Sequence, residues 1–312
     1  MSTLTDTDFA AISTEDRIYL YYQQEKTILE VHSSDGVKWV PGISLAVDQL
    51  DPNGSPITAY FVKNDGSHDD KPTIHVFYID SHGKLCEQNR VVSDSKWQAG
   101  NLPTEIATAP VNTSKLSSGV CHDEEQDQSH QWVYFTQENK DKGIYEVAEI
   151  RSGSPRWEWV YRKVLPDKGQ AALPGTTIAA NITDAVNYLF FQDHAGNIMQ
   201  YSGGLEKWES GEVLIKSGNA VINTPLASCL SVEPGKIHMF YAANTATAGF
   251  SVQDFADQKN IRVTSWAPGS RLGAAKLSNT VYLFYKDATL PLAISTMLYK
   301  DGAWSRGPKV VG

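Results

Sequence analysis

The chain has 312 residues, of which 41% are hydrophobic and 20% are charged, and its formal net charge at pH 7 is −9. These values are typical of a globular protein, and the acidic balance excludes a nucleic-acid partner, which would require a basic surface. No apolar run approaches the roughly 18 residues of a membrane-spanning segment, so we expect no membrane partner.

The N-terminal segment, MSTLTDTDFAAIS, is acidic and polar. It lacks the basic start and apolar middle of a secretion signal, so we expect the protein to be cytoplasmic, or exported by an unusual route. The cysteines Cys86, Cys121 and Cys229 are widely spaced and match no zinc-binding pattern. We therefore expect thiols without disulfides, no metal and no cofactor.

Three sequence markers recur in the same order along the chain. The first is a strand of small and apolar residues, which occurs as FAAIS (9–13), ITAYFV (57–62), LSSGVC (116–121), TIAANI (177–182), PLASCL (225–230) and LGAAKL (272–277). The second is an aromatic strand, which occurs as RIYLYYQ (17–23), IHVFYID (74–80), WVYFTQ (132–137), YLFFQD (188–193), IHMFYAA (237–243) and VYLFYKD (281–287). The third is a tryptophan that closes each unit, namely Trp39, Trp97, Trp157, Trp208, Trp266 and Trp304, and all except Trp157 stand in W-x-x-G.

A further alternating run lies between the second and third markers in four of the units, as KTILEV (26–31), GKLCEQ (83–88), KGIYEV (142–147) and GNIMQY (196–201). The turns that end in Gly83 and Gly196 predict hairpins, because glycine adopts a positive φ without strain. Each unit is thus predicted to hold three or four short antiparallel strands, and the units repeat about every 50 residues. The order and period predict an all-β, six-bladed β-propeller formed as a single domain over residues 1–312. A β-sandwich is the alternative, but it would not require this repeat.

These repeats resemble those of the fungal fucose-binding lectins of the Aleuria type along essentially the whole chain. Those lectins are six-bladed propellers that bind fucose between adjacent blades. An arginine on the aromatic strand and a glutamate on the next strand hold the hydroxyls of the sugar there, while an aromatic side chain packs on its apolar face. The resemblance places the glutamate at Glu30, Glu87 and Glu146, with Gln200 in the fourth unit, Gln253 or Val263 in the fifth, and Thr296 as the nearest match in the sixth.

The arginine of the resembling lectins is missing from all six units. Its position is occupied by Tyr19, His75, Trp132, Tyr188, His238 and Tyr282. Losing a hydrogen bond from a charged group costs roughly 1.5–3 kcal/mol, which is about tenfold to a hundredfold in affinity. Flat amphipathic side chains at these positions suit an apolar or aromatic small molecule, or they fill the core between blades. We treat these six residues, the matching Glu and Gln residues and Trp208 as candidate ligand-binding residues.

Conventional catalytic motifs are absent from the sequence, including G-x-S-x-G, H-E-x-x-H, the Walker loop and G-x-G-x-x-G. A pericyclic reaction remains open, because it needs neither nucleophile nor cofactor but only two π-systems held in a reactive pose. The chain resembles a degenerate branch of these propellers, the fungal hetero-Diels–Alderases of tropolone–sesquiterpenoid biosynthesis. That resemblance implies a substrate pair of a tropolone quinone methide and a humulene-type alkene.

Three functions are therefore weighed from the sequence. The first is a cofactor-free pericyclase of fungal natural-product biosynthesis, whose catalytic residues the sequence does not identify. The second is a divergent lectin that binds fucose or another carbohydrate, and the third is a propeller scaffold for protein partners. Because the resembling lectins often form dimers, a homodimer is left open.

The sequence does not select one groove between blades or one mouth of the channel as the site. We expect a groove around the third to fifth units, where the long fifth-unit insert, 243–258, would bring Phe250 and Phe255 near the ligand.

Overall fold

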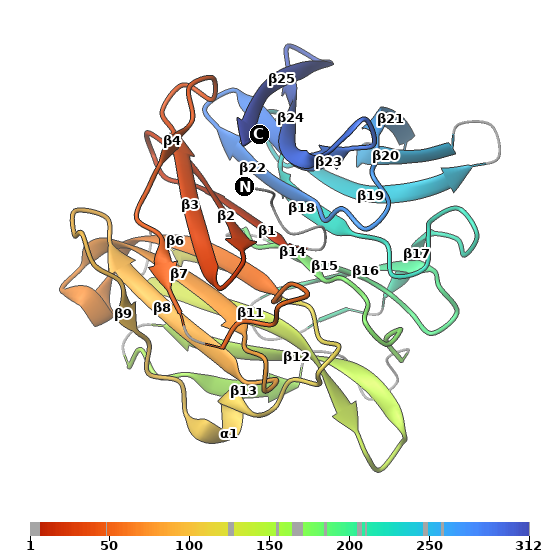
Figure 1. The fold of residues 1–312 in the computed structure, drawn as a ribbon. Helices are drawn as coiled ribbons and strands as arrows, with labels where there is room; N and C mark the ends of the chain where they lie inside the picture. The colour runs from red at the N-terminus through yellow and green to blue at the C-terminus, as the bar shows by residue number, and fades with distance from the viewer. Residues whose placement is uncertain are drawn as a thin grey trace. The chain divides into compact units, whose positions relative to one another are not determined.

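The computed structural model describes residues 7–47, 49–123, 128–153, 156–163, 171–183, 186–204, 208–209, 211–245, 249–256 and 259–311. Nearly all of the regular structure in these ranges is β-strand, arranged in six antiparallel sheets. We call each sheet a blade and number the blades in chain order (Figure 1). The expected all-β, six-bladed propeller fold with antiparallel blades is confirmed.

Strands of one blade follow one another in the sequence. Blade 1 contains β1 (Phe9–Ser13), β2 (Ile18–Gln24), β3 (Thr27–Ser33), β4 (Val40–Pro41) and β5 (Leu45–Ala46). Blade 2 contains β6 (Ile57–Asp65), β7 (Lys71–Ile79), β8 (Leu85–Val91) and β9 (Gln98–Ala99). Blade 3 contains β10 (Ser117–Asp123), β11 (Gln128–Asn139), β12 (Ile144–Gly153) and β13 (Val160–Lys163).

The other three blades repeat this order. Blade 4 contains β14 (Ala179–Asn181), β15 (Asn187–Gln192), β16 (Ile198–Gly203) and β17 (Glu212–Ile215). Blade 5 contains β18 (Leu226–Leu230), β19 (Ile237–Thr245), β20 (Gly249–Ala256) and β21 (Lys259–Ser265). Blade 6 contains β22 (Gly273–Leu277), β23 (Thr280–Asp287), β24 (Leu290–Lys300) and β25 (Ala303–Val311). The helical pieces are the 3₁₀ turn η1 (Gly66–His68) and the short helix α1 (Thr104–Ala107), and both follow strands of blade 2.

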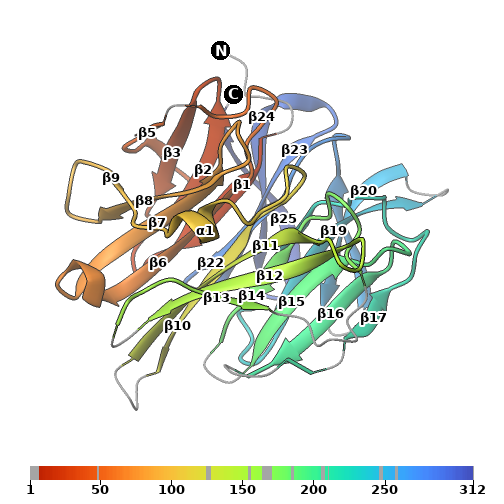
Figure 2. The same ribbon diagram turned by 90° about the horizontal axis from the view of Figure 1, so that it is seen from below.

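The chain divides into two compact units. Unit 1 contains residues 1–57 and 219–312, and unit 2 contains residues 58–218. Blades 1, 5 and 6 therefore lie in unit 1, and blades 2, 3 and 4 lie in unit 2, whose strands run from β6 to β17 (Figure 2). That residues 1–312 behave as a single domain remains a prediction.

The first strands of neighbouring blades pack closely within each unit. In unit 2, Thr58 of β6 hydrogen-bonds Ser118 of β10 at 2.7 Å. A Cβ atom added to Gly119 of β10 would lie 2.3 Å from the side chain of Ile182. In unit 1, a Cβ atom on Gly273 of β22 would lie 2.9 Å from Phe9 of β1. This crowding explains the small residues of the first marker.

The aromatic second strands are covered on both faces. In β2 every side chain from Ile18 to Gln23 is buried, and β23 is buried from Val281 to Asp287. A strand that lies inside a sheet and is buried on both faces has no solvent-facing row, so its sequence is a nearly continuous apolar run. Burial on both faces therefore accounts for the repeated aromatic runs.

A hydroxyl group before the first strand anchors the second strand in five of the blades. The hydroxyl of Thr224, for example, accepts a hydrogen bond from the backbone N–H of Ala242 at 2.9 Å. The equivalent pairs, with the hydroxyl first, are Thr7 and Gln23, Ser114 and Thr136, Thr176 and Gln192, and Ser270 and Lys286. The hydroxyl thus gives a hydrogen-bond partner to a buried backbone N–H that is not paired with a neighbouring strand.

The two predicted hairpin turns are confirmed. Gly83 and Gly196, with φ angles of 78° and 83°, close them. The three cysteines lie in the described ranges and form no disulfide. No helix in those ranges is long and apolar enough to span a membrane.

Candidate functional site

The strand register shows which residue of each third strand corresponds to Glu30 and Glu87, and we call this place the carboxylate position. In every blade it pairs with a second-strand residue. That second-strand residue lies two places after the one at the lectins' arginine position. Tyr21 pairs with Glu30 in blade 1, and Phe77 pairs with Glu87 in blade 2. The corresponding pairs in blades 3 to 6 are Tyr134 with Glu149, Phe190 with Gln200, Phe240 with Asp254 and Phe284 with Thr296. Four of the six positions are therefore acidic.

This register corrects two assignments made from the sequence. In blade 3 the residue at the carboxylate position is Glu149, while Glu146 pairs with Gln137 and lies on the opposite face of the sheet. Glu146 accepts a hydrogen bond from Asn139 there, at 2.9 Å. In blade 5 the position belongs to Asp254 rather than Gln253 or Val263. The assignments of Gln200 and Thr296 agree with the register.

In four blades, a tryptophan of the following blade in the same unit packs against the second-strand aromatic residue that pairs with the carboxylate position. Trp159 of blade 3 meets Phe77 edge-on at 5.4 Å, and its indole N–H points to Glu87 Oε2 at 3.3 Å. Edge-on pairs also join Trp208 to Tyr134, Trp304 to Phe240 and Trp39 to Phe284. Trp208 donates a hydrogen bond to Glu149, as Trp159 does to Glu87. Trp159, and not Trp157, therefore takes the closing role in blade 3.

The glycine of the W-x-x-G motif lies against the carboxylate position. Gly42 and Gly100 donate their backbone N–H groups to the carbonyl oxygens of Glu30 and Glu87, each at 2.8 Å. A Cβ atom on Gly100 would lie 2.2 Å from Glu87 Oε2, and one on Gly42 would lie 2.0 Å from Glu30 Oε1. Only glycine leaves room for the carboxylate at these places, which explains the motif.

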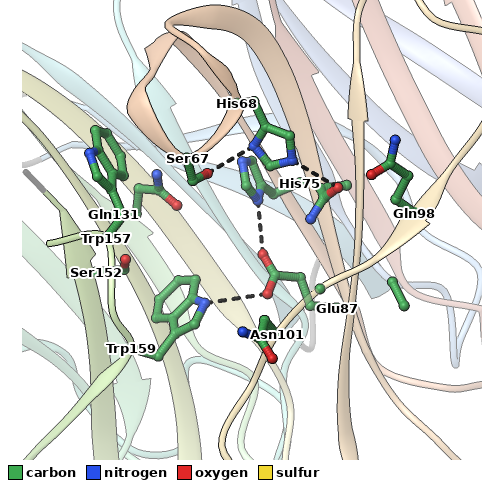
Figure 3. Close-up of a pocket in the computed structure, with 13 residues that line it drawn as sticks. Ser67, His68, His75, Glu87, Gln98, Asn101, Gln131, Ser152, Trp157 and Trp159 are labelled. Atoms are coloured by element: carbon green, nitrogen blue, oxygen red, sulfur yellow. Dashed lines mark hydrogen bonds and ion pairs between the residues drawn. The ribbon is translucent and has the colours of Figure 1, made fainter.

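A pocket of about 310 Å³ lies between blades 2 and 3, within unit 2 (Figure 3). Its polar lining includes Ser67, His68, His75, Glu87, Asn89, Gln98, Asn101, Gln131 and Ser152, and its aromatic lining is Trp157 and Trp159. Trp157 has a φ of 54°, and its indole packs against Gly66 of η1, where a Cβ atom would lie 2.4 Å from Nε1. The pocket thus combines two indole rings with many hydrogen-bonding groups.

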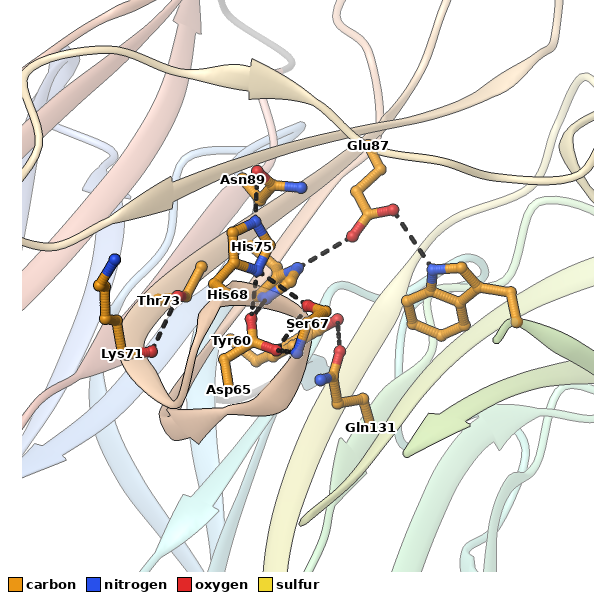
Figure 4. Close-up of polar contacts among 11 residues, drawn as sticks. Tyr60, Asp65, Ser67, His68, Lys71, Thr73, His75, Glu87, Asn89 and Gln131 are labelled. Carbon is orange, nitrogen blue, oxygen red and sulfur yellow. Dashed lines mark hydrogen bonds and ion pairs between the residues drawn. The ribbon is translucent and has the colours of Figure 1, made fainter. Parts of the chain in front are cut away.

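His75 lies between two carboxylates beside this pocket (Figure 4). Its Nε2 is 2.8 Å from Asp65 Oδ2, and its Nδ1 is 2.9 Å from Glu87 Oε1. Because a carboxylate only accepts hydrogen bonds, both ring nitrogens must carry a proton, and His75 is an imidazolium. Burial alone would lower the pKa of His75, but the hydrogen bonds to Asp65 and Glu87 and their charges raise it to about 9. A cation therefore persists at the position where the resembling lectins have arginine.

Asp65 is the second fully enclosed charge of this group. Ser67 donates from its backbone N–H and its hydroxyl to Asp65 Oδ1, at 3.0 and 2.6 Å. Burial would raise the pKa of Asp65, but the hydrogen bonds from His75 and Ser67 and the nearby imidazoles lower it to about 2. Tyr60 stacks on the His75 ring at 4.9 Å and donates its hydroxyl to Gln131 Oε1 at 2.6 Å, which joins blade 2 to blade 3.

Glu149 shows the opposite electrostatic behaviour. Burial raises its pKa to about 7, although Arg151, Trp208 and Arg162 each lower it in part. A shallower groove of about 230 Å³, lined by His130, Arg151, Arg156 and Arg162 among others, lies on the same blade. Glu149 is thus partly protonated at neutral pH, unlike Asp65.

The other sequence-predicted site residues are mostly enclosed. Of the six residues at the lectins' arginine position, Tyr188 is half-buried and the other five, Tyr19, His75, Trp132, His238 and Tyr282, are buried. Glu30 accepts from the Tyr21 hydroxyl at 2.8 Å inside blade 1, and Gln200 donates to Glu212 at 3.0 Å. Ligand binding by these residues remains a prediction. The side chain of Phe250 lies outside the described residues, and Phe255 is half-buried.

Blade 5 repeats part of the blade 2 arrangement. His238 Nδ1 is 2.8 Å from Asp254 Oδ2, and the Trp304 indole N–H reaches the same oxygen at 3.3 Å. The second nitrogen of His238 faces the hydroxyl of Ser231 at 3.1 Å, where His75 faces Asp65. His238 therefore contacts one carboxylate where His75 contacts two, and the two histidines can be compared directly.

Sequence analysis did not single out the pocket residues Asp65, His68, Gln131, Trp157 and Trp159 as ligand-binding candidates. Asp65 ends the first strand of blade 2 and His68 lies in the turn that follows, which has no counterpart among the repeat markers. The sequence WEW places tryptophans at 157 and 159. In an extended segment, residues two apart point to the same face, so this spacing could have predicted that both indoles face the same side.

No protein-family profile and no curated protein sequence matches the chain. Solved structures do match, with low sequence identity over nearly the full length. The Aleuria aurantia lectin in complex with Fucalpha1-6GlcNAc has a TM-score of 0.77 at 16% identity, covering 99% of this chain and 97% of the lectin. The chain has the fold of the Aleuria-type lectin propellers.

Two further Aleuria-type comparisons agree. The SapL1 lectin in complex with alpha methyl fucoside has a TM-score of 0.74 at 20% identity, covering 99% of this chain and 98% of the lectin. AofleA from Arthrobotrys oligospora has a TM-score of 0.75 at 16% identity, covering 97% of this chain and 86% of that protein. The recognised Aleuria-type fold is thus confirmed, while the identities are too low to transfer ligand-binding residues.

Proposed function

We propose that the chain is a carbohydrate-binding protein and that the pocket between blades 2 and 3 holds the sugar. The observation that carries the proposal is the lining of this pocket, where Trp157 and Trp159 stand beside the Glu87 carboxylate and several amide and hydroxyl groups. A sugar ring presents hydroxyls at its edge and C–H groups on its face. Carboxylates and amides suit the hydroxyls, and indole rings suit the face.

The roles within the pocket follow from the hydrogen bonds already made. Both nitrogens of His75 are engaged by Asp65 and Glu87, so His75 acts by holding the Glu87 carboxylate in place. Glu87 then offers its remaining lone pairs to sugar hydroxyls. Gln131 accepts from Tyr60 through its carbonyl oxygen, which directs its NH₂ group as a donor.

Fucose is the first sugar to test, because two of the matching lectins are described in complex with fucosides. The polar lining supports the lectin alternative over the pericyclase, whose quinone-methide and alkene partners would need apolar walls. The pericyclase hypothesis makes its own prediction, which is a changed rate or stereochemistry of the adduct when protein is added to the two reactants.

A glycan array followed by calorimetric titration with alpha-methyl fucoside tests the proposal. Glu87→Gln should weaken binding about tenfold to a hundredfold, because it removes a charged hydrogen-bond acceptor. Asp254→Asn changes the equivalent residue of blade 5 and should leave affinity at the blade 2–3 pocket unchanged. Absence of binding on the array and in the titration would refute the proposal, as would equal affinity for wild type and Glu87→Gln.

A further inference from the structure

Three potential metal-ligand atoms converge beside the pocket of blade 2 (Figure 4). They belong to Asp65, His68 and His75, and all lie within 4.8 Å of one another. Asp65 Oδ2 is the common point, since it is 2.9 Å from His68 Nδ1 and 2.8 Å from His75 Nε2. Tetrahedral metal bonds of about 2.0–2.1 Å place ligand atoms about 3.3–3.4 Å apart. The two contacts of Asp65 are therefore hydrogen-bond distances in the metal-free protein, and each would lengthen by about 0.5 Å around one ion.

Each of the three side chains is oriented by a partner on its other side. His75 Nδ1 meets Glu87 Oε1 at 2.9 Å, and His68 Nε2 meets Asn89 Oδ1 at 3.1 Å. Ser67 occupies Asp65 Oδ1, so that Oδ2 is the oxygen directed at the two rings. Histidines that bind metals almost always donate their second ring N–H to a carboxylate or carbonyl, which fixes the tautomer and the ring orientation. The group already has this outer set of hydrogen bonds.

His68 Nδ1 lies 2.9 Å from Asp65 Oδ2 and 2.8 Å from Ser67 Oγ. Because an ionised carboxylate only accepts hydrogen bonds, Nδ1 carries a proton in the metal-free protein. A metal ion bound to Nδ1 and to Asp65 Oδ2 would take the place of this proton. Imidazole and carboxylate ligands together favour a divalent transition metal over Mg²⁺ or Ca²⁺.

We propose that Asp65, His68 and His75 form a binding site for one divalent first-row transition-metal ion, such as Zn²⁺. His75 is an imidazolium in the metal-free protein, so binding of the ion displaces the proton on Nε2, while the proton on Nδ1 stays directed at Glu87. Three protein ligands leave coordination positions for other groups. His68 and His75 both line the pocket, and the side chain of His68 is 19% exposed, so the ion has a route of entry. The site does not rest on the proposed sugar binding, which concerns Glu87 and the tryptophans.

The three proposed zinc ligands do not follow any of the common sequence spacings of zinc-binding motifs. Asp65 ends β6, His68 closes η1 and His75 lies inside β7, so the ligands come from a strand end, a turn and a strand. Blade 5 lacks this arrangement. The Nε2 atom of His238 contacts the hydroxyl of Ser231, whereas Nε2 of His75 contacts the carboxylate of Asp65. Among the described residues of blade 5, no second histidine joins His238 in a group of possible metal ligands. His238 is therefore a natural control for nonspecific binding by a buried histidine.

Chelator-stripped, untagged protein titrated with Zn²⁺ by calorimetry tests the site, and the visible absorption of added Co²⁺ reports the coordination. We expect one ion per chain, with no binding of Mg²⁺ under the same conditions. His68→Ala should weaken zinc binding by more than the about 10–100-fold that loss of an outer partner costs, and Asn89→Ala should weaken it by that smaller factor. Because His68 lies in a half-buried turn, its variant is expected to keep the wild-type melting temperature in chelator.

His82→Ala, in an exposed turn of the same blade, and His238→Ala serve as controls and should retain wild-type zinc affinity. The proposal is overturned if wild type binds no zinc, or if His68→Ala binds zinc as tightly as wild type. A fucoside titration in the presence of chelator addresses the carbohydrate proposal separately. Loss of one function would therefore not be mistaken for loss of the other.

Discussion

Trp304 donates its indole N–H to Asp254 Oδ2 across 3.3 Å, which links blade 6 to blade 5. Trp159 does the same for Glu87, also at 3.3 Å, between blades 3 and 2. Each indole also packs edge-on against the aromatic residue that pairs with its acidic partner. Each junction combines a hydrogen bond to a carboxylate with aromatic packing, so the tryptophan of one blade is part of the packing of the preceding blade.

Trp304→Phe should lower the free energy of unfolding by about 1.5 kcal/mol or more, since it removes a hydrogen bond to a charged group but keeps a ring. Urea denaturation followed by circular dichroism measures the change. Trp97→Phe, which replaces a half-buried indole beside Arg90, is the comparison. An unchanged midpoint for Trp304→Phe would show that the Asp254 contact contributes nothing.

In chelator-treated, metal-free protein the His75 imidazolium should be visible by NMR as a ring that titrates with a pKa of about 9. Its pKa is raised on folding, so its stabilising effect is complete below the unfolded value of about 6.5 and is lost as pH rises through 9. The difference in unfolding free energy between wild type and His75→Gln should therefore shrink over that range. A ring that titrates near 6.5 in the folded protein would contradict the two-carboxylate arrangement.

Glu149 should make stability fall with rising pH. Burial raises its pKa to about 7, so the neutral form favours the folded state. Its effect is most favourable below about 4.5 and is lost as pH rises through 7. Glu149→Gln, which stays neutral, should gain stability relative to wild type between these limits. Parallel urea midpoints at pH 4.5 and pH 8 would argue against this effect.

Gly100→Ala should disturb the Glu87 carboxylate, because the new Cβ would lie 2.2 Å from Oε2. We expect weaker ligand binding, and we expect the free energy of unfolding to fall by the roughly 1–3 kcal/mol that is typical of overpacking, which lowers the melting temperature. Gly204→Ala is the matched control, since no atom lies within 4 Å of the Cβ that it would add. Equal behaviour of the two variants in calorimetry and thermal melting would rule out this packing role.

Thr224→Val should leave the buried N–H of Ala242 without its hydroxyl partner. We expect a loss of about 1–3 kcal/mol in unfolding free energy, while Thr224→Ser, which keeps the hydroxyl, should recover most of it. Denaturant titration of the three proteins measures the difference. If valine and serine are equivalent, the hydroxyl anchor contributes no stability.

The fold could be predicted because the same three markers recur in the same order in each unit. The second marker was easy to recognise, because a strand that is buried on both faces is rich in aromatic and apolar residues. The carboxylate position could not be assigned in every blade from letters alone. The I-x-E pattern of the two strands matches Glu146 to Glu30, but blade 3 pairs two more residues beyond Tyr134 than blade 1 pairs beyond Tyr21. Since side chains alternate, the three-residue error moved the prediction to the other face.

The pocket depended on contacts that no periodic pattern encodes. Asp65 and His68 reach His75 through the turn η1, whose conformation is fixed by the Ser67 hydrogen bonds to Asp65. Trp159 comes from a neighbouring blade and meets Glu87 only after the blades pack, and Trp157 of the same blade lines the pocket with it. A sequence pattern describes one blade at a time, while the site is shared between two.

The unequal hairpins have an evolutionary consequence. The ladder from Tyr134 and Glu149 continues to Asn139 and Ile144, while the ladder from Tyr21 and Glu30 stops at Gln24 and Thr27. Both lengths leave an acid opposite an aromatic ring. Residues added as cross-strand pairs extend the tip outward without altering this geometry. The hairpin tips are thus natural points for insertion, where peptide tags or new binding loops could be grafted while the junctions between blades stay intact.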